Sequence, residues 1–424
     1  MILAQSIPVW KLYQHVPVIV FIFAFGAIVG SFINVVIYRL PAGMSVITPS
    51  SRCPTCGARL SWWENTPILG WLLVRGRCRH CGVAISPQYM LVELFMALLF
   101  AGLYLAFYMK GPSATAGWWG EVGGDWWYRN GVSGTFPAFI ALLFMLAGLV
   151  AMTIIDARTF EIPMKIPLVL TLVALAAWPV QALLPANVTA RAQGLWAIQT
   201  TDWQWFAVAC GGMLGILVSL VLLRRGVLRY SFADYEQYVE EGETFADYPH
   251  ARREMAVEML YLGPCIAGLV LGYLVGAKIG GGPPPVIIQA VGGSLLGYLV
   301  GGGLVWAVRI LGTLGFGREA MGLGDVHLLG AVGAVLGWTD PIFIFLLAPF
   351  FGLMWAVLSM GFSSLLHKKR RELPYGPHLA VATLVVILCR PVVSWVQMTY
   401  LPGVPQSGLL QSAPPTGLSG APRP

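Results

Sequence analysis

Long runs of apolar residues, separated by shorter polar segments, follow one another along most of the chain. Ten of these runs approach the length of about 20 residues at which a helix crosses a bilayer. They cover residues 17–38, 89–109, 136–155, 166–184, 206–223, 259–279, 287–311, 326–338, 341–362 and 378–400. The eighth run is short, so we expect it to be re-entrant or to start below the membrane surface. The pattern predicts an all-α polytopic membrane protein with about 8–10 transmembrane helices.

Composition supports this fold class and adds an orientation. Of the 424 residues, 57% are hydrophobic and 11% are charged, and the mean hydropathy is +0.73, which excludes an ordinary soluble domain. Lysine and arginine gather in alternate loops: residues 39–88, 156–165, 224–258, 309–325 and 363–377 carry 6, 2, 5, 2 and 4 of them, 19 of the chain's 26. The positive-inside rule places these loops in the cytoplasm and the N-terminus outside. The net charge of +7 is therefore a signal of orientation, and it gives no case for nucleic-acid binding.

The runs and loops divide the chain into six parts. They are a first transmembrane span (1–39), a cytoplasmic four-cysteine lobe (40–88), a transmembrane region with a first candidate aspartate (89–202), an extra span pair with a cytoplasmic loop (203–280), a transmembrane region with a Gly-x-Gly-Asp motif (281–401) and a tail expected to be disordered (402–424). The first 16 residues lack the pattern of a cleavable signal peptide, so we expect the first span to stay as an anchor. We interpret the loop 230–258, rich in Asp, Glu and Tyr, as a solvated helical excursion, with partner docking as the alternative.

Four cysteines in the lobe have the spacing of a metal site. Cys53 and Cys56 form one C-x2-C pair, and Cys78 and Cys81 form a second pair after 21 intervening residues, close to the zinc-ribbon template. Each pair sits in a tight turn that aims two thiolates at one point, and four sulfurs fill a tetrahedral structural zinc site with no open position for chemistry. The alternatives are two disulfides or four idle thiols. A reducing cytoplasm disfavours disulfides, so we expect zinc.

Two aspartates stand at the ends of apolar runs on the expected cytoplasmic side. Asp325 follows Gly322 and Gly324 at the start of the run 326–338, and Asp156 closes the run 136–155. An acid at bilayer depth is costly and indicates a functional site. Two such carboxylates can share one proton, one acting as base toward a water and the other as acid, which is aspartic-protease chemistry. The glycines would let an extended peptide or a neighbouring helix lie close.

Each aspartate also has a structural interpretation. Asp156 could pair with Arg158 or Lys165, and Asp325 could serve as a helix N-cap. Glu93, about one turn into the second span, could face the cytoplasmic cleft or extend to the surface. Because the two aspartates lie at the same expected membrane face, we favour the functional interpretation of the pair.

Taken together, these motifs resemble the prepilin peptidases, the type 4 prepilin leader peptidase/N-methyltransferases, which are Gly-x-Gly-Asp intramembrane aspartyl proteases. The resemblance rests on five stretches that stand in the family's order: 30–41, the four-cysteine loop, Asp156 with Ile162-Pro163, 321–326 and 373–377. It covers roughly residues 20–185 and 287–385. It implies that Asp156 and Asp325 are catalytic and that the substrates are prepilins or type II secretion pseudopilins, cleaved in the bacterial cytoplasmic (inner) membrane at its cytoplasmic face. It also implies methylation of the new N-terminus with S-adenosylmethionine, for which the sequence offers no recognisable binding residues.

The chain departs from the family pattern at three places. His327 stands where the family commonly has Lys, Met164 stands where an acidic or amide residue is common, and the span pair 203–280 is extra. Two other classes of function remain open. One is a proton- or cation-coupled transporter that uses the aspartate pair, and the other is a non-enzymatic scaffold of a secretion machine.

Overall fold

The computed structural model describes residues 9–109, 122–184, 198–238, 248–279, 282–366 and 374–400. Apart from two isolated bridges in the lobe, the regular structure within these ranges is helical. The elements are α1 (Val9–Arg39), α2 (Leu69–Leu73), α3 (Gln88–Tyr104), η1 (Leu105–Met109), α5 (Gly124–Thr159), α6 (Lys165–Leu183), α8 (Trp203–Arg224), η2 (Tyr235–Tyr238), α9 (Ala251–Gly276), α10 (Val286–Phe316), α11 (Leu323–Leu336), α12 (Asp340–Leu366), α13 (Gly376–Leu388) and α14 (Arg390–Tyr400).

The helices match the predicted apolar runs. Within the described ranges, eight helices are long and apolar enough to cross a membrane, which confirms the predicted fold class. The short eighth run is the 14-residue helix α11. The tenth run is not one straight span, because α13 and α14 meet at an 82° bend. Buried Arg390 begins α14 and binds buried Asp340 at 2.6 Å, which ties the bend to the start of α12.

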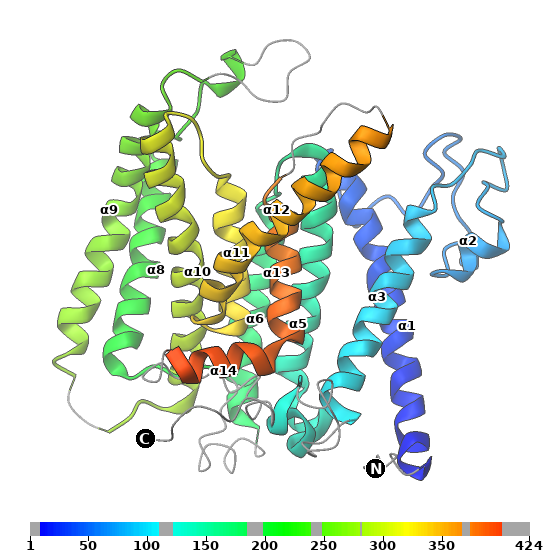
Figure 1. Ribbon diagram of the computed structural model, residues 1–424, viewed down its shortest axis with the longest axis horizontal. Helices are drawn as coiled ribbons and strands as arrows, with labels where there is room; N and C mark the ends of the chain where they lie inside the picture. The colour runs from blue at the N-terminus through cyan, green and yellow to red at the C-terminus, as the bar shows by residue number, and fades with distance from the viewer. Residues whose placement is uncertain are drawn as a thin grey trace.

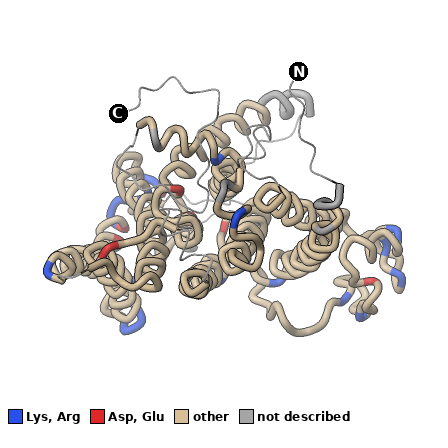
Figure 2. Tube along the Cα trace, turned by 90° about the horizontal axis from the view of Figure 1, so that it is seen from below, with Lys and Arg blue, Asp and Glu red and all other residues tan. Residues whose placement is uncertain are grey.

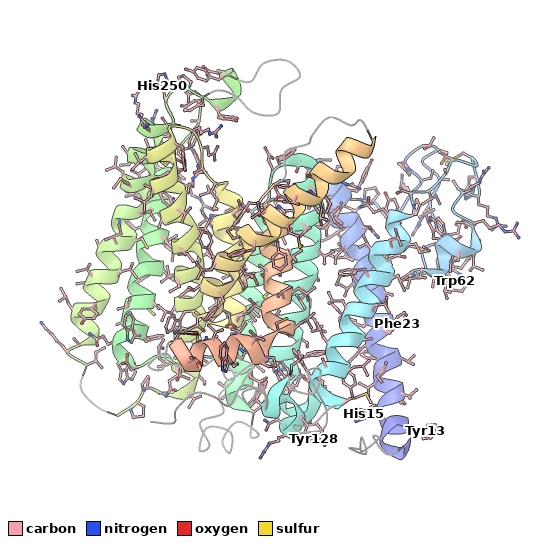
Figure 3. All side chains as sticks on the ribbon, in the orientation of Figure 1. Tyr13, His15, Phe23, Trp62, Tyr128 and His250 are labelled. Carbon is pink, nitrogen blue, oxygen red and sulfur yellow. The ribbon has the colours of Figure 1, made fainter. Side chains whose placement is uncertain are left out.

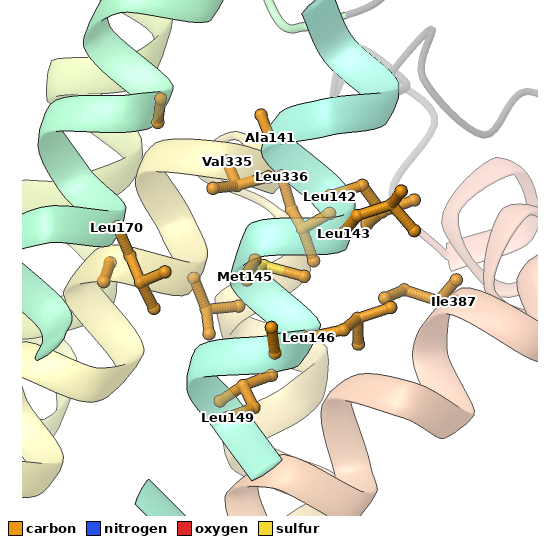
Figure 4. Close-up of a cluster of buried hydrophobic side chains, with 14 of the residues drawn as sticks. Ala141, Leu142, Leu143, Met145, Leu146, Leu149, Leu170, Val335, Leu336 and Ile387 are labelled. Carbon is orange, nitrogen blue, oxygen red and sulfur yellow. The ribbon is translucent and has the colours of Figure 1, made fainter. Parts of the chain in front are cut away.

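Helix α11 lies at the centre of the bundle. Every residue from Asp325 to Leu336 except His327 is buried, and the helix packs against α10 and α6. The close approach to α10 depends on small residues: a Cβ placed on Gly297 would lie 2.0 Å from the backbone oxygen of Gly333. Figure 4 shows the apolar core that α11 shares with α5, including Leu142, Met145 and Leu336. A short helix is thus held in the interior by its neighbours.

Both aspartates and the lobe lie at one end of the bundle. Figure 1 places the lobe, the end of α5 and the start of α11 at the top of the view, whereas α14 runs across the bottom. In Figure 3, His250 and Trp62 belong to the segments that extend from the upper part of the bundle, and Tyr13 and Tyr128 lie at the lower end. Figure 2 shows few charged residues along the helices and a group of Lys and Arg on the lobe. The described Lys and Arg residues of the loops 39–88, 156–165, 224–258 and 309–325 belong to this end.

The extra span pair is a tight helical hairpin of α8 and α9. A Cβ on Gly211 would lie 2.0 Å from the backbone oxygen of Gly268, so the two backbones touch. Residues 251–258, which we had expected to be part of a solvated loop, are the first turns of α9. Glu254 and Glu258 are buried there, with 2% and 3% of their surface exposed. The solvated interpretation of this part of the loop was therefore wrong. The predicted tail 402–424 lies outside the described residues.

Candidate active site

Asp325 lies in the first turn of α11 and points into the protein. Its N-cap is Gly322, whose backbone is extended (φ −70°, ψ 145°), so the N-cap role expected as an alternative for Asp325 was wrong. The residue is 7% exposed, and its Oδ1 has no hydrogen-bond partner among the described residues. Gly324 is required for packing, because a Cβ at this position would lie 2.7 Å from Cβ of Ile162. The glycine thereby brings the start of α11 against the segment that follows α5.

Asp156 lies in the last turn of α5. It is 4% exposed, and its backbone oxygen accepts the N–H of Phe160, which ends the helix in a left-handed conformation. No ion pair joins Asp156 to Arg158 or Lys165, and the Arg158 side chain donates to the side-chain oxygen of Gln88 instead. Within the described residues Oδ2 of Asp156 also has no hydrogen-bond partner. The ion-pair interpretation is therefore wrong for this carboxylate.

The structure brings the two carboxylates to one place. Helices α5, α11 and α13 pack on one another, and Ile162 contacts both Gly324, next to Asp325, and Gly376, which adjoins Asp156. The start of α13 closes the site: a Cβ on Gly376 would lie 2.5 Å from Oδ2 of Asp156 and 3.3 Å from Cδ1 of Ile162. Three polar atoms are buried here without protein partners in the described chain, namely Asp156 Oδ2, Asp325 Oδ1 and Tyr375 Oη. Such an arrangement is suited to bind a polar substrate group or a water.

Tyr375 and Gly376 were not among the site residues predicted from the sequence. The signal was present in 373–377, one of the five stretches on which the family resemblance rests. The sequence did not show that this glycine touches a carboxylate. By contrast, His327, the residue that departs from the family pattern, turns to α10, where its Nδ1 lies 2.8 Å from the hydroxyl of Tyr298.

The motif at 30–41 holds α1 to α3, and Glu93 of α3 holds the lobe. Gly30 packs on the backbone of Glu93, and Asn34 donates to the backbone oxygen of Tyr89 at 2.9 Å. The Oε2 of Glu93 accepts the backbone N–H of Ile68 in the lobe at 2.6 Å. Glu93 is 8% exposed, so it does not extend to the surface, and its Oε2 is bound to the lobe. Its role in the structure is to fix the lobe.

The four cysteines of the lobe converge as predicted. All four sulfurs lie within 4.8 Å of one another, with Cys53 and Cys81 at 3.9 Å and Cys56 and Cys78 at 4.0 Å. A tetrahedral zinc with bonds of about 2.3 Å sets its sulfurs about 3.8 Å apart, so the cluster fits the ion. The backbone N–H groups of Cys56 and Thr55 lower the pKa of the Cys53 thiol to about 6, which favours the thiolate that binds metal. No disulfide joins these cysteines.

Comparison with known proteins shows which families the chain is similar to. Residues 23–107 match the model of the bacterial peptidase A24 N-terminal domain, and residues 258–357 match that of the type IV leader peptidase family. Asp325 lies inside the second match and Asp156 between the two. The second match begins in α9, so it takes in part of the span pair that we had regarded as extra.

Relatives with the same printed name align with different parts of the chain. A prepilin leader peptidase/N-methyltransferase of Aeromonas salmonicida is 26% identical over 393 residues, which cover 87% of this chain and 89% of the relative. One of Myxococcus xanthus is 58% identical over 81 residues, which cover 19% of this chain and 24% of the relative. One of Burkholderia pseudomallei is 32% identical over 208 residues, which cover 42% of this chain and 59% of the relative. No solved structure matches the chain. The two matched domains and the nearly full-length relative thus make the chain similar to the type IV leader peptidase family over most of its length.

Proposed function

We propose that this protein is an intramembrane aspartyl endopeptidase in which Asp156 and Asp325 are the catalytic pair. Its substrates are type IV prepilins or type II secretion pseudopilins, from which it removes the leader. The observation that carries the proposal is the meeting of two buried carboxylates, 169 positions apart in the chain, each with an oxygen that no described protein group binds. Neither the transporter nor the scaffold alternative gains support from the matched families.

The chemistry follows from the proximity of two like charges. Two carboxylates in one buried site do not both ionise, so they share a proton. The ionised member takes a proton from water as the water oxygen attacks the peptide carbonyl carbon. The protonated member gives its proton to the carbonyl oxygen, which leaves a neutral tetrahedral diol. As the C–N bond breaks, the carboxyl that took the water's proton gives it to the leaving amine, and one diol hydroxyl returns its proton to the other carboxylate. Gly322 leaves room beside Asp325, because the nearest heavy atom to a Cβ there is Oδ2 of Asp325 itself at 3.5 Å.

An apolar groove lies on the bundle surface and is lined by residues of α5 up to Ile154, two positions before Asp156. It has a volume of about 320 Å³ and is formed by α3, α5 and α13, with a lining that includes Phe95, Leu146, Thr153 and Val381. Thr153 lies one helical turn before Asp156 on α5. We infer that the apolar helix of the precursor lies in this groove while its basic leader stays in water. The scissile bond then falls where the helix meets the membrane surface.

Orientation, zinc and methylation complete the proposal. The end that carries the site also carries the described parts of the Lys- and Arg-rich loops, so the positive-inside rule supports a cytoplasmic position for this end. The inner membrane is supported by the family resemblance. A zinc ion bound by Cys53, Cys56, Cys78 and Cys81 would stabilise the lobe and take no part in peptide cleavage.

The relatives' printed names support a second activity, N-methylation of the new N-terminus, with S-adenosylmethionine as the methyl donor. No residues are assigned to it.

The test is cleavage of a pilin-type precursor by the full chain in lipid vesicles. Mass spectrometry of the product reads leader removal and the mass of one added methyl group separately. Asp156→Asn and Asp325→Asn are each expected to abolish leader removal while the protein stays folded. The matched control is Asp202→Asn, the same change at an exposed N-cap at the opposite end of the bundle, which should cleave like the wild type. Persistent cleavage by both site variants would contradict the proposal.

A further inference from the structure

Arg309 of α10 is a buried cation that contacts the extra span pair. Only 2% of the residue is exposed. Its Nε lies 2.9 and 3.1 Å from the two carboxylate oxygens of Glu258, and its Nη2 lies 2.8 Å from Oε1 of the same side chain. Glu258 belongs to α9, so this ion pair joins α9 to α10. Bidentate pairing of this kind fixes the guanidinium plane as well as its charge.

The other side of the same guanidinium faces the approach to Asp325. Nη1 of Arg309 donates to the backbone oxygen of Met321 and to the carboxylate of Glu319. Met321 directly precedes Gly322, the N-cap of α11. One planar group therefore bridges a carboxylate in α9 and the backbone that leads into the Gly-x-Gly-Asp motif. A lysine has no such fork and cannot make both sets of contacts in the same geometry.

Glu258 is itself held in place from several directions. Trp306 donates its Nε1–H to Oε2 of Glu258 at 2.8 Å, and the hydroxyl of Ser231 donates to Oε1 at 3.1 Å. The ring of Phe232 lies against the Arg309 guanidinium, 5.3 Å from its centroid. These contacts satisfy the buried pair, as a charge taken out of water requires. The pair is consequently a rigid support on the α9 side.

The segment that Arg309 contacts needs such support. Two glycines within the four residues before Asp325 leave the free backbone many conformations, and fixing them costs more entropy than fixing other residues. The N-cap at Gly322 offers no side-chain hydrogen bond to hold the helix start. Apart from the Arg309 contact, Ala320 donates its backbone N–H to the hydroxyl of Thr313 at 3.1 Å. The position of the Asp325 carboxylate therefore depends on how firmly this segment is tied to α10.

We propose that Glu258 and Arg309 form a positioning relay that fixes residues 321–324 and thereby sets the place of Asp325. The α8–α9 pair then has a role in the active site: it supplies the carboxylate that holds Arg309. Neither residue touches the substrate in this proposal, so both are positioning residues. The consequence for turnover rests on the proposed peptidase function, whereas the consequence for the backbone of 321–324 does not.

The first experiment measures the backbone directly and needs no activity. Hydrogen–deuterium exchange is followed in the full chain in lipid nanodiscs for wild type, Arg309→Lys and the matched control Arg229→Lys. Arg229 pairs with Glu254 and is half exposed, so its replacement leaves the contact with Met321 intact. Loss of one buried hydrogen bond predicts about tenfold faster exchange at 322–325 in Arg309→Lys. Unchanged exchange there, or an equal change in the control, would overturn the relay.

The second experiment measures turnover of a pilin-type precursor. Arg309→Lys is expected to lower kcat on the order of 100-fold, as misplacement of a catalytic group by about 1 Å does, with KM changed by less than about twofold. Glu258→Gln should act in the same direction, and the double variant should lose no more than the stronger single variant, because the two residues act through one contact. Independent, multiplying losses, or a fall that only tracks the folded fraction, would refute the relay.

The two experiments separate failure of the relay from failure of the proposed function. If the wild type does not cleave but exchange at 322–325 rises only in the Arg309 variant, the peptidase assignment falls and the backbone support stands. If the wild type cleaves and Arg309→Lys matches it in both kcat and exchange, the relay falls and the peptidase assignment stands.

Discussion

The contact between Gly376 and Asp156 makes a sharp prediction about catalysis. In Gly376→Ala, the new Cβ would lie 2.5 Å from Oδ2 of Asp156, which is 0.9 Å less than the 3.4 Å at which ordinary contacts begin. The same Cβ would lie 3.3 Å from Cδ1 of Ile162. The backbone at Gly376 is not in the left-handed region, so alanine is compatible with the local conformation. The strain therefore comes from the close contacts of the new Cβ alone. The Asp156 carboxylate must therefore move by close to 1 Å.

This displacement of the Asp156 carboxylate should lower kcat far more than it lowers the free energy of unfolding. Misplacing a catalytic group by about 1 Å lowers kcat on the order of 100-fold. Overpacking costs roughly 1–3 kcal/mol of unfolding free energy, and the better helix propensity of alanine at the start of α13 offsets up to about 1 kcal/mol of it. The assay is steady-state cleavage of a pilin-type precursor, with thermal unfolding measured on the same samples.

The control for this prediction is Gly303→Ala in α10. A Cβ at Gly303 would have no heavy atom within 4 Å, so the substitution tests the glycine-to-alanine change without a clash. It should keep wild-type kcat and raise stability by up to about 1 kcal/mol. The reasoning is refuted if folded Gly376→Ala cleaves within about twofold of the wild type.

Three further predictions concern the lobe and the groove. Metal analysis should find one zinc per chain, near zero after Cys78→Ser and unchanged after Cys210→Ser, because Cys210 is in α8 and outside the four-sulfur cluster; a metal-free wild type would contradict the site. Glu93→Ala leaves the Ile68 N–H without its acceptor, at a cost of about 1–3 kcal/mol to docking of the lobe; hydrogen exchange at 66–73 should quicken while zinc is retained, and unchanged exchange would count against this contact. Val381→Trp fills the groove between α3, α5 and α13 and should raise KM for the precursor with kcat nearly constant, whereas the same KM as wild type would exclude the groove as the substrate site.

Sequence patterns predicted the helices and the cluster of cysteines because both depend on local spacing. An apolar run long enough to span a bilayer has few alternatives to a helix, since unpaired backbone groups are costly in lipid. Each C-x2-C pair brings its own two sulfurs together by a tight turn, and the zinc-ribbon spacing between the pairs predicted that Cys53 would meet Cys81. Asp325 was marked by the glycines beside it. In each case the signal lies within a few residues of the group concerned.

The sequence could not predict contacts set by packing between distant segments. The approach of Gly376 to Asp156 depends on how α13 docks on α5, and nothing near either residue encodes that distance. The loop 230–258 appeared solvated because it is rich in charge, yet the pairing of Glu258 with Arg309 buries its last turn. The break between α13 and α14 was also missed, because hydropathy alone does not report the buried pair of Asp340 and Arg390.

The most direct test of the account is the turnover of Asp156→Asn, Asp325→Asn and the double variant on one precursor, with folding verified for each. If the two carboxylates act as one unit, each single variant loses nearly all activity, by roughly 10⁴-fold or more, and the double variant is no worse than the singles. Either single variant cleaving at a rate close to that of the wild type would contradict the claim that these two side chains hydrolyse the leader together.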